Sequence, residues 1–449
     1  TVLWLSGLTL LRWVNLVSAA TGPEVPVEWG LRTLHGKQGL WLVVSLVLGF
    51  LILQVEGTFF IRTAWLNYGI QLLLCSLVLV IGKKVGGARS WFGFGSFGIQ
   101  PSEFAKMGAS LALAWYCSKE GGLNNFGQRF RAAVIVGIPA GLILLQPDAG
   151  TVLVFLGFVF AMYREGLSGA VLIVGFAAVV MAVLTILSGA GDLTYPMVGE
   201  ANGIYRFWIL FVVLGAGAIA LVRNATVPRY RARITTQAVI STIAALLFSV
   251  VMHLALEEVL RPHQRERIQV LFGLEVDNPD ADYNIRHAKT AIGSGGWTGM
   301  GWRNGPMTGY GFVPEQETDF IFCTWSEEWG LVGSTVFLIL FASFILRILF
   351  LAERQRSAFT RVYAYSLGGI LFMHMLINVG MVLGLAPVIG IPLPFMSYGG
   401  SSFMAFALMI AILVRLDAER FSVLRHNRSA EDGYFDDGEF HFTANVGAE

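Results

Sequence analysis

The sequence predicts an all-α polytopic membrane protein with about twelve transmembrane helices. Of its 449 residues, 55% are hydrophobic and only 14% are charged, and the mean hydropathy is +0.65. A soluble protein of this length would carry far more charge. The third observation is the recurrence of apolar stretches close to the roughly 20 residues that a helix needs to span a bilayer.

The predicted spans follow one another along the chain. The interval 320–350 is too long for one straight span, so we expect it to tilt or to begin as a helical turn on the loop side. The polar interval 259–319 is interpreted as one large loop outside the membrane. The apolar segments lie near residues 2–20, 38–55, 64–81, 102–117, 132–146, 150–163, 168–187, 204–222, 236–258, 320–350, 362–384 and 399–416.

The arginines and lysines of the short loops predict the orientation of the chain. Alternate loops carry most of them, including Arg164, Arg229, Arg354 and Arg361, and the segment after the last span is also rich in arginine. Cytoplasmic loops are enriched in these residues, so these loops and the C-terminus are predicted to be cytoplasmic. The loop 259–319 then faces the periplasm or the cell exterior, where no ATP is available.

Residues 1–428 are interpreted as one integral membrane domain. Residues 429–449 are acidic, lack apolar periodicity and are predicted to form a flexible cytoplasmic tail. The three cysteines are dispersed, and no cluster of His, Cys and carboxylate residues has the spacing of a metal site. No motif demands a cofactor or indicates nucleic-acid binding, and assistance by a divalent cation (Mg or Mn) stays open.

Asp319 lies at the mouth of the apolar segment that begins at Phe320. An ionisable residue at a membrane boundary is costly to keep and is a functional candidate by default. One interpretation is that Asp319 caps the following helix by accepting its free N–H groups. The other is that a partly shielded carboxylate has a raised pKa and acts as a general base. The two roles are compatible.

Glu103 and Lys106 lie three residues apart at the start of a predicted helix and therefore share one of its faces. They either neutralise each other within the membrane or line a polar cavity, and we favour a structural pair that also borders a cavity. Asp148 is expected to cap the helix that follows it. His374 is expected to be a hydrogen-bonded histidine of the helix core.

The loop 259–319 concentrates cations beside glycines. Arg265 and Lys289 precede the run GSGG at 293–296, a combination that suits a phosphate-bearing ligand. The alternative is an ordinary solvated loop, because glycines alone are weak evidence and no phosphate-loop motif is present.

A second unusual segment follows the prolines Pro387, Pro392 and Pro394, which break the backbone before the run Ser397–Ser402. Irregular backbone at membrane depth is tolerated only where it is buried in protein or lines a cavity. We therefore expect this segment to lie inside the helical bundle.

Ten motifs together resemble one protein family. They are similar to the shape, elongation, division and sporulation (SEDS) family, and specifically to its elongation branch, RodA. The PEQ sequence at 314–316 resembles that branch more than the division branch, FtsW, which usually has Ala after the Glu. In chain order the motifs are GARSW (87–91), QPSEFAK (100–106), QPDAGT (146–151), KTAIGSGG (289–296), GMGW (299–302), FVPEQ (312–316), TDFIF (318–322), EEWGLVG (327–333), NVGMV (378–382) and PLPFMSYGGSS (392–402).

The resemblance implies a peptidoglycan glycosyltransferase of the bacterial cytoplasmic (inner) membrane that polymerises lipid II for cell elongation and cell shape. The family's essential aspartate corresponds to Asp319, and its membrane-embedded ion pair corresponds to Glu103 and Lys106. The implied partners are lipid II, the growing glycan strand, a class B penicillin-binding protein (transpeptidase), other elongation-complex membrane proteins and membrane lipid.

We expect Asp319 to take the proton of the attacking sugar hydroxyl in a single inverting displacement. Three cations are expected to stabilise charge on the diphosphate leaving group: Lys289, Arg265 and Arg89. The other candidate substrate-binding residues are Glu103, Lys106, Glu315, Ser397, Tyr398 and Ser401.

Two alternatives to this function stay open. Broken helices and intramembrane charges serve transporters equally well, so one alternative is a lipid II flippase. The other is a non-catalytic scaffold that recruits the crosslinking enzyme.

Two features depart from the family pattern. Glu317 stands where the family usually has His, and this second carboxylate is expected to raise the pKa of Asp319 or its own. Family members usually have ten spans, and here the interval 188–258 is interpreted as containing an inserted helical pair. Inserting a pair of spans preserves the sidedness of the loops.

Overall fold

The computed structural model of the chain describes residues 2–21, 30, 33–85, 88–94, 97–190, 203–254 and 279–420. Arg265, the segment 259–278 and the predicted tail 429–449 lie outside these residues, so their predictions are not tested.

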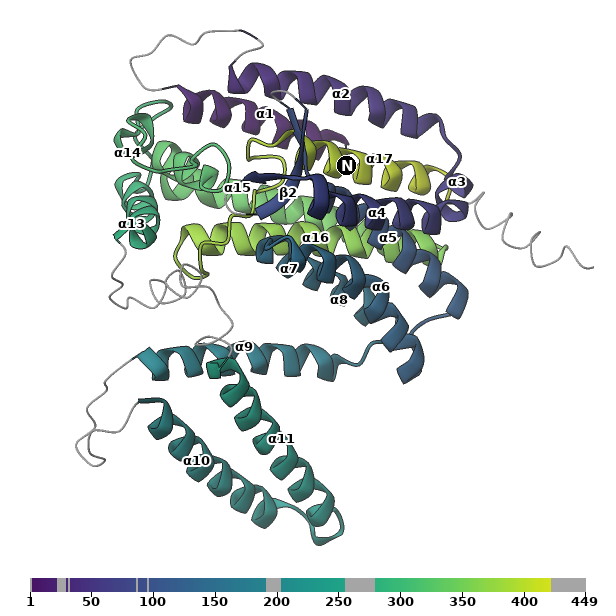
Figure 1. Cartoon of the computed structure of the whole chain (residues 1–449), viewed down its shortest axis with the longest axis vertical. Coiled ribbons are helices and arrows are strands. Elements are labelled where there is room, and N and C mark those ends of the chain that lie inside the picture. The colour runs from purple at the N-terminus through teal and green to yellow at the C-terminus, as the bar shows by residue number, and fades with distance from the viewer. Residues whose placement is uncertain are drawn as a thin grey trace, which may run out of the picture.

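The predicted all-α fold is confirmed, and every predicted apolar segment contains helix (Figure 1). The segment 150–163 is interrupted by a 3₁₀ turn at Phe155–Gly157. The helices are α1 (Val2–Ala20), α2 (Leu34–Gln54), α3 (Gly57–Arg62), α4 (Ala64–Ile81), α5 (Pro101–Glu120), α6 (Phe126–Leu145), α7 (Ala149–Val154), α8 (Phe158–Arg164), α9 (Gly169–Ala190), α10 (Gly203–Ala225), α11 (Pro228–Leu254), α13 (Pro279–Ser294), α14 (Pro306–Gly309), α15 (Ile321–Glu353), α16 (Ala358–Val382) and α17 (Gly400–Ala418).

Nine of the described helices are long and apolar enough to cross a membrane. Helix α5 is not among them, because Glu103, Lys106 and Lys119 lower its hydropathy although the helix is 20 residues long. The stretches Leu5–Ala20 and Ala149–Arg164 are shorter apolar helices. The protein is therefore a multi-pass membrane protein, and the exact number of spans stays a prediction.

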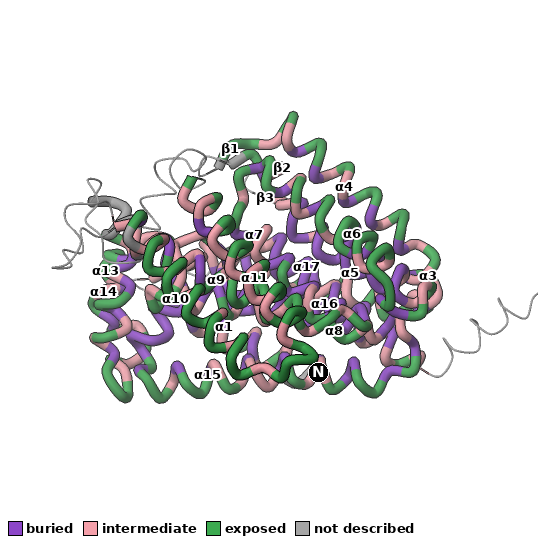
Figure 2. The backbone as a smooth tube through the Cα atoms, turned by 90° about the horizontal axis from the view of Figure 1, so that it is seen from below, coloured by how far each residue is buried: buried purple, intermediate pink, exposed green. Residues whose placement is uncertain are grey.

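Helix α16 lies at the centre of the main bundle, where it packs against α5, α8, α15 and α17 (Figure 1). Buried residues concentrate along α5, α16 and α17, whereas the outer helices are largely exposed (Figure 2). The buried face of α5 is rich in Ala, Gly and Ser. Such small side chains let helices approach closely in a membrane, where lipid gives no hydrophobic drive for association.

Helices α9, α10 and α11 pack on one another and lie to one side of the main bundle (Figure 1). The hydroxyl of Ser249 on α11 joins them, because it contacts the hydroxyl of Thr185 on α9 (2.7 Å) and accepts from the indole N–H of Trp208 on α10 (3.0 Å). Helices α10 and α11 fall within the interval predicted to hold the inserted pair. That they are an insertion stays a prediction.

The apolar segment 320–350, which is too long for one straight span, forms helix α15. It runs for 33 residues, but Gly330 (φ 62°, ψ −165°) breaks it into a short first part and a longer second part. A Cβ at this position would lie 2.4 Å from the backbone nitrogen of Gly299. The break therefore lets the loop that precedes α15 pack closely on the helix. The N–H of Leu331 donates to the carbonyl of Gly296 in this loop (2.9 Å).

A small antiparallel sheet between α4 and α5 was not predicted from the sequence. It contains β1 (Lys83–Val85), β2 (Ala88–Phe94) and β3 (Phe97–Ile99) in the order β1-β2-β3. Such short strands are marginal alone, and these pack against α4, α5 and α17.

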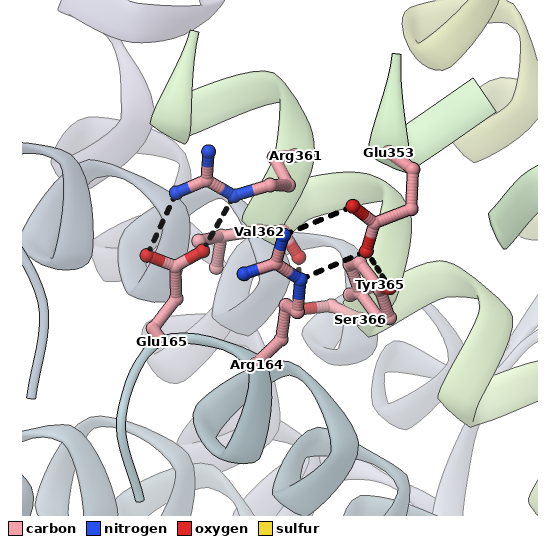
Figure 3. A network of polar contacts seen from close by, with 7 residues as sticks. All are labelled: Arg164, Glu165, Glu353, Arg361, Val362, Tyr365 and Ser366. Carbon is pink, nitrogen blue, oxygen red and sulfur yellow. Dashed lines mark hydrogen bonds and ion pairs between the residues drawn. The ribbon is translucent and has the colours of Figure 1, made fainter. Parts of the chain in front are cut away.

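The ends of α8, α15 and α16 are joined by a polar network (Figure 3). Arg164 forms a two-bond pair with Glu353 (2.8 and 2.9 Å), and Arg361 forms another with Glu165 (2.8 and 3.0 Å). The hydroxyl of Tyr365 also donates to Glu353. Partly exposed pairs contribute little each, but these bidentate pairs fix the relative positions of three helices.

The backbones of Gly157 and Gly369 touch where the interrupted α7–α8 stretch crosses α16. A Cβ on Gly369 would lie 2.2 Å from the carbonyl oxygen of Gly157. Gly369→Ala is therefore expected to lower the free energy of unfolding by about 1–3 kcal/mol through overpacking. Thermal unfolding in detergent measures the change. The control is Gly141→Ala on α6, where a Cβ meets nothing within 4 Å, and equal unfolding midpoints for the two variants would contradict the prediction.

Candidate active site

The segment that carries Asp319 folds as a tight turn before α15. The carbonyl of Glu315 accepts from the N–H groups of Thr318 (3.1 Å), Asp319 (3.1 Å) and Phe320 (3.2 Å). Glu315 itself has φ 52°, a left-handed conformation that is uncommon for a residue with a side chain. Strain of this kind persists where the surroundings enforce it.

Asp319 does not occupy the cap position of α15. The helix begins at Ile321, and Phe320 is the N-cap residue, without a side-chain cap hydrogen bond. Asp319 is half-buried and precedes the cap by one residue. The capping interpretation of Asp319, which places the aspartate at the N-cap, is therefore not the arrangement observed.

Asn378 on α16 links Asp319 to the proline-rich segment between α16 and α17, residues 383–399. The amide nitrogen of Asn378 donates both to the carbonyl of Asp319 (2.8 Å) and to that of Ile391 (2.7 Å). A Cβ on Gly390 would lie 3.1 Å from Oδ2 of Asp319, and φ there is 75°. Glycine at 390 thus permits both the backbone turn and the close approach of the carboxylate.

Glu317 is tied to the same segment, because its carbonyl accepts from the N–H of Tyr398 (2.7 Å). Burial raises the pKa of the half-buried Glu317 carboxyl above its ordinary value, and the charge of Glu315 adds to the shift. The expectation of a raised pKa is confirmed for Glu317, but desolvation is the main cause and the neighbouring charge is Glu315.

The predicted pair of Glu103 and Lys106 is confirmed as a fully buried ion pair. The ammonium of Lys106 donates to Oε2 of Glu103 (2.8 Å) and contacts Nε2 of His374 (2.9 Å). It also lies 4.9 Å from the ring centroid of Phe406, which is within the range of a cation–π interaction. The charged side chain of Lys106 on α5 thereby contacts both α16 and α17.

His374 links this pair to the segment 383–399. Its Nδ1–H donates to the carbonyl of Pro392 (3.0 Å), which leaves Nε2 as the acceptor for Lys106. The prediction of a hydrogen-bonded core histidine is confirmed. His374 and Asn378 stand one turn apart on α16 and bind the consecutive carbonyls of Pro392 and Ile391. The ion pair and Asp319 are thus held by one helix face.

The QPDAGT motif also packs against this segment. Asp148 caps α7 by accepting from the N–H (3.0 Å) and hydroxyl (2.8 Å) of Thr151, as predicted, and it also accepts from the amide of Gln100 (3.0 Å). A Cβ on Gly150 would lie 2.9 Å from side-chain carbons of Ile389 and Ile391. The glycine therefore lets α7 approach residues 389–391.

The structure brings Lys289 to the same segment. Lys289 lies on α13, and a Cβ on Gly384 (φ 71°) would lie 2.4 Å from its Nζ. Gly384 and Gly390 belong to one stretch of chain, so this stretch meets Lys289 at one point and Asp319 at another.

Arg89 lies elsewhere. It is exposed on β2, where its guanidinium donates to the carbonyl of Val80 (3.5 Å). Its predicted role at the diphosphate stays a prediction.

The predicted residues near α17 have structural contacts of their own. The hydroxyl of Ser397 accepts from the N–H of Leu393 (2.7 Å), which closes a turn inside the segment. Ser401 is buried in the first turn of α17. Their binding of substrate stays a prediction.

Sequence reasoning missed the part played by Glu327 and Glu328 inside α15. Glu327 accepts from the N–H groups of Met307 (2.8 Å) and Thr308 (2.9 Å), and Glu328 accepts from the N–H of Arg303 (2.9 Å) and from the hydroxyl of Ser18. The two carboxylates hold the loop before the Asp319 turn. Two adjacent carboxylates within an apolar helix were the available signal.

Arg12 on α1 was missed as well. It is buried, and its Nη2 donates to the carbonyl of Ser397 (2.6 Å). An arginine within an apolar stretch was the signal.

These contacts arrange a half-buried carboxylate, a nearby second carboxylate and a lysine around one irregular segment. Such a set can accept a proton and attract an anionic group. In the described part of the chain, no group of three or more His, Cys, Asp and Glu side chains is placed to hold a metal ion.

Comparison with known proteins identifies the family. The model of the FtsW, RodA and SpoVE proteins, described as cell cycle proteins, matches residues 2–194 and 210–421. The chain belongs to this family. It is 33% identical over 399 residues to the peptidoglycan glycosyltransferase RodA of Treponema pallidum, covering 86% of this chain and 89% of that protein. It is 30% identical over 418 residues to the peptidoglycan glycosyltransferase MrdB of Escherichia coli, covering 92% of each.

Solved structures agree with this placement. One is described by the words "structural coordination of polymerization and crosslinking by a peptidoglycan synthase complex". It is 27% identical with a TM-score of 0.66, over 94% of this chain and 97% of that one. The crystal structure of the Thermus thermophilus rod shape determining protein RodA is 24% identical with a TM-score of 0.57, over 94% and 96%. At that identity the second likeness concerns the fold alone.

Removing the Lys106 charge tests the buried pair. Lys106→Met leaves Glu103 buried without its partner, so we expect the free energy of unfolding to fall by about 3–5 kcal/mol. The double variant Glu103→Gln with Lys106→Met removes both charges and is expected to recover part of that loss. Thermal unfolding measures both, with the exposed Lys119→Met on the same helix as control. A double variant no more stable than the single one would refute a structural ion pair.

The pKa of Glu317 predicts a pH-dependent stability. Because the folded-state pKa is raised, the native state at neutral pH holds a partly buried charge that the unfolded state leaves in water. Glu317→Gln is therefore expected to stabilise the fold at about pH 7, and this gain vanishes as the pH falls below the ordinary glutamate value of 4.5. Unfolding midpoints between about pH 4 and about pH 8 measure the change. The control is the exposed Glu56→Gln, and identical pH profiles for the two variants would contradict the prediction.

Proposed function

We propose that the protein is a peptidoglycan glycosyltransferase of the RodA type, which polymerises lipid II into glycan strands for cell elongation and cell shape. The observation that carries the proposal is the half-buried carboxylate of Asp319 just before α15, in a turn whose backbone carbonyl at Asp319 accepts a hydrogen bond from Asn378. It stands in a chain that is 33% identical to one named peptidoglycan glycosyltransferase and 30% identical to another.

Asp319 acts as the general base. The 4-hydroxyl oxygen of the acceptor sugar attacks the anomeric carbon of the donor, and Asp319 takes the hydroxyl proton as the new bond forms. The bond between that carbon and the diphosphate breaks, and its electron pair leaves with undecaprenyl diphosphate. A single displacement converts an α-linked donor into a β-linked product, which requires one base on the attacking side.

The leaving group needs positive charge rather than a nucleotide, because lipid II is already activated. Lys289 is the cation best placed for this role, since its ammonium lies against Gly384 in the segment that also meets Asp319. Arg265 and Arg89 are assigned to the same task from the sequence. Charge that develops on the diphosphate is stabilised by such preplaced cations.

The buried Glu103 and Lys106 pair acts on the site through position. It fixes His374, which with Asn378 places the carbonyls of the segment beside Asp319. Glu315, Ser397, Tyr398 and Ser401 are assigned to the substrate-binding surface around this segment.

The enzyme works in the bacterial cytoplasmic membrane, with its C-terminus in the cytoplasm and Asp319 on the outer side. The arginine-rich network of Arg164 and Arg361 at the opposite end of α16 supports this orientation. Its partner is a class B penicillin-binding protein that crosslinks the product. The likeness to a component of a peptidoglycan synthase complex supports such a partner.

The proposal is tested with purified protein and its partner. Asp319→Asn is expected to lower the rate of lipid II polymerisation by about 100-fold or more, because a general base contributes that much, while the unfolding midpoint is retained. The control is Asp417→Asn at the far end of α17, where the carboxylate pairs with Arg354 and is expected to affect stability without affecting polymerisation.

Normal glycan chains from Asp319→Asn would eliminate it as the base. Lipid II flipping by the wild type in proteoliposomes without any polymer would assign the chain to transport instead. Loss of polymerisation by Asp319→Asn with complex formation intact would exclude a scaffold.

A further inference from the structure

Among the described residues, the buried cation Arg12 has no anionic partner. It stands in the middle of α1 and its side chain is 3% exposed. None of the ion pairs in the described part of the chain includes it. By contrast, Arg164, Arg354, Arg361 and Arg415 each pair with a carboxylate. A buried charge is costly unless an opposite charge accompanies it, so the environment of Arg12 is suited to an anion.

Only one of the three guanidinium nitrogens of Arg12 donates hydrogen bonds to described residues. Nη2 donates to the carbonyl of Ser397 (2.6 Å) and weakly to that of Gly399 (3.5 Å), and the guanidinium lies 4.5 Å from the ring centroid of Phe403. Nε and Nη1 are buried and have no hydrogen-bond partner among the described residues. Each of these two nitrogens can still donate to an oxygen of an anionic group such as a phosphate.

These contacts place the guanidinium at the start of α17. Gly399 is the N-cap residue of this 19-residue helix and provides no side-chain cap. The first N–H groups of a helix have no intrahelical acceptor, and the helix dipole gives this end a partial positive charge. Anions bind at such ends, and here a buried arginine lies beside one.

Helix α2 contributes a further donor. Oε1 of Gln38 accepts from the N–H of Gly399 (3.4 Å), while Nε2 of Gln38 is buried without a partner among the described residues. The ring of Trp41 packs on Gly400, where a Cβ would lie 2.1 Å from its indole atoms. Arg12 and Gln38 therefore lie beside the first residues of α17, and the ring of Trp41 packs on the first of them.

The pattern of burial on α2 is inverted for a helix in a bundle. Its buried residues are polar, namely His35, Gln38 and Ser45. Its large apolar side chains, including Val43, Leu46 and Phe50, are exposed. A membrane helix with a polar inner face lines a polar interior, and its apolar outer face is suited to the hydrocarbon of the bilayer, as expected for a candidate span.

We propose that Arg12, Gln38 and the first turn of α17 form a binding site for the phosphate of a lipid-linked ligand. Under the proposed function, on which this assignment rests, the ligand is a polyprenyl diphosphate, and the site contributes to holding the lipid-linked substrate or product. The diphosphate satisfies the free donors of Arg12 and Gln38. It also provides a negative charge for the buried guanidinium, with which no described residue forms an ion pair.

Binding is measured with undecaprenyl diphosphate and purified protein in nanodiscs of neutral lipid. Arg12→Gln is expected to weaken binding by about 10- to 100-fold, which is the usual loss for a hydrogen bond to a charged group. The matched control is Arg415→Gln at the other end of α17, where the arginine donates to the carbonyl of Val55 (2.6 Å) and pairs with Glu419. It is expected to bind the diphosphate as the wild type does.

A second variant does not depend on losing Arg12. Gln38→Glu keeps the acceptor for Gly399 but replaces the free donor with a carboxylate. It is expected to raise the unfolding midpoint by pairing with Arg12 and to weaken diphosphate binding at least as strongly as Arg12→Gln. Unchanged binding by either variant overturns the proposal.

Two further readouts distinguish a diphosphate site from a purely structural role of Arg12 and from a phospholipid site. A fall in kcat for lipid II polymerisation by Arg12→Gln, with KM and diphosphate affinity unchanged, would mean that Arg12 only holds the Ser397 carbonyl, and would overturn the proposal. Equal competition by phosphatidylglycerol would assign the site to a phospholipid headgroup and overturn the polyprenyl assignment. A wild type that binds the diphosphate but makes no polymer would refute the proposed function and leave the site intact.

Discussion

Residues 391–397 of the segment between α16 and α17 are largely buried and must satisfy their backbone polar groups within the protein, and much of the structure follows from that constraint. Side chains from distant helices supply the partners. Asn378 and His374 donate hydrogen bonds to the carbonyls of Ile391 and Pro392, and Arg12 donates to that of Ser397. Each of these side chains is itself buried, so the helices around the segment are positioned by its irregular backbone.

The buried charge on Lys106 shows how this positioning extends through the bundle. Its ammonium contacts Glu103, His374 and the ring of Phe406, which belong to α5, α16 and α17. A lone charge in this place would be far too costly. The chain therefore combines an internal ion pair with a neutral histidine acceptor. The histidine in turn donates to the carbonyl of Pro392 and so links the ion pair to the proline-rich segment.

Local patterns were predictable from the sequence, and non-local contacts were not. Glu103 and Lys106 are three residues apart, and Asp148 precedes the helix it caps, so spacing alone was sufficient. The contact of Arg12 with Ser397 spans 385 residues, and no local rule predicts which carbonyl such a side chain meets. The sheet at residues 83–99 was missed because its strands are only three to seven residues long. Asp319 was identified by its chemistry, but its hydrogen bond from Asn378 and its closeness to Gly390 required the fold.

Helix α16 is fastened at both ends by different chemistry. Arg361 and Tyr365 belong to the charged network at one end, while His374 and Asn378 bind backbone carbonyls at the other. Arg361 and Asn378 are about 25 Å apart along the axis, at about 1.5 Å per residue. Sliding the helix by a single residue would break the contacts at both ends at once. The fixed length of helix α16 therefore sets the depth of Asp319 relative to the charged network at the opposite end of this helix.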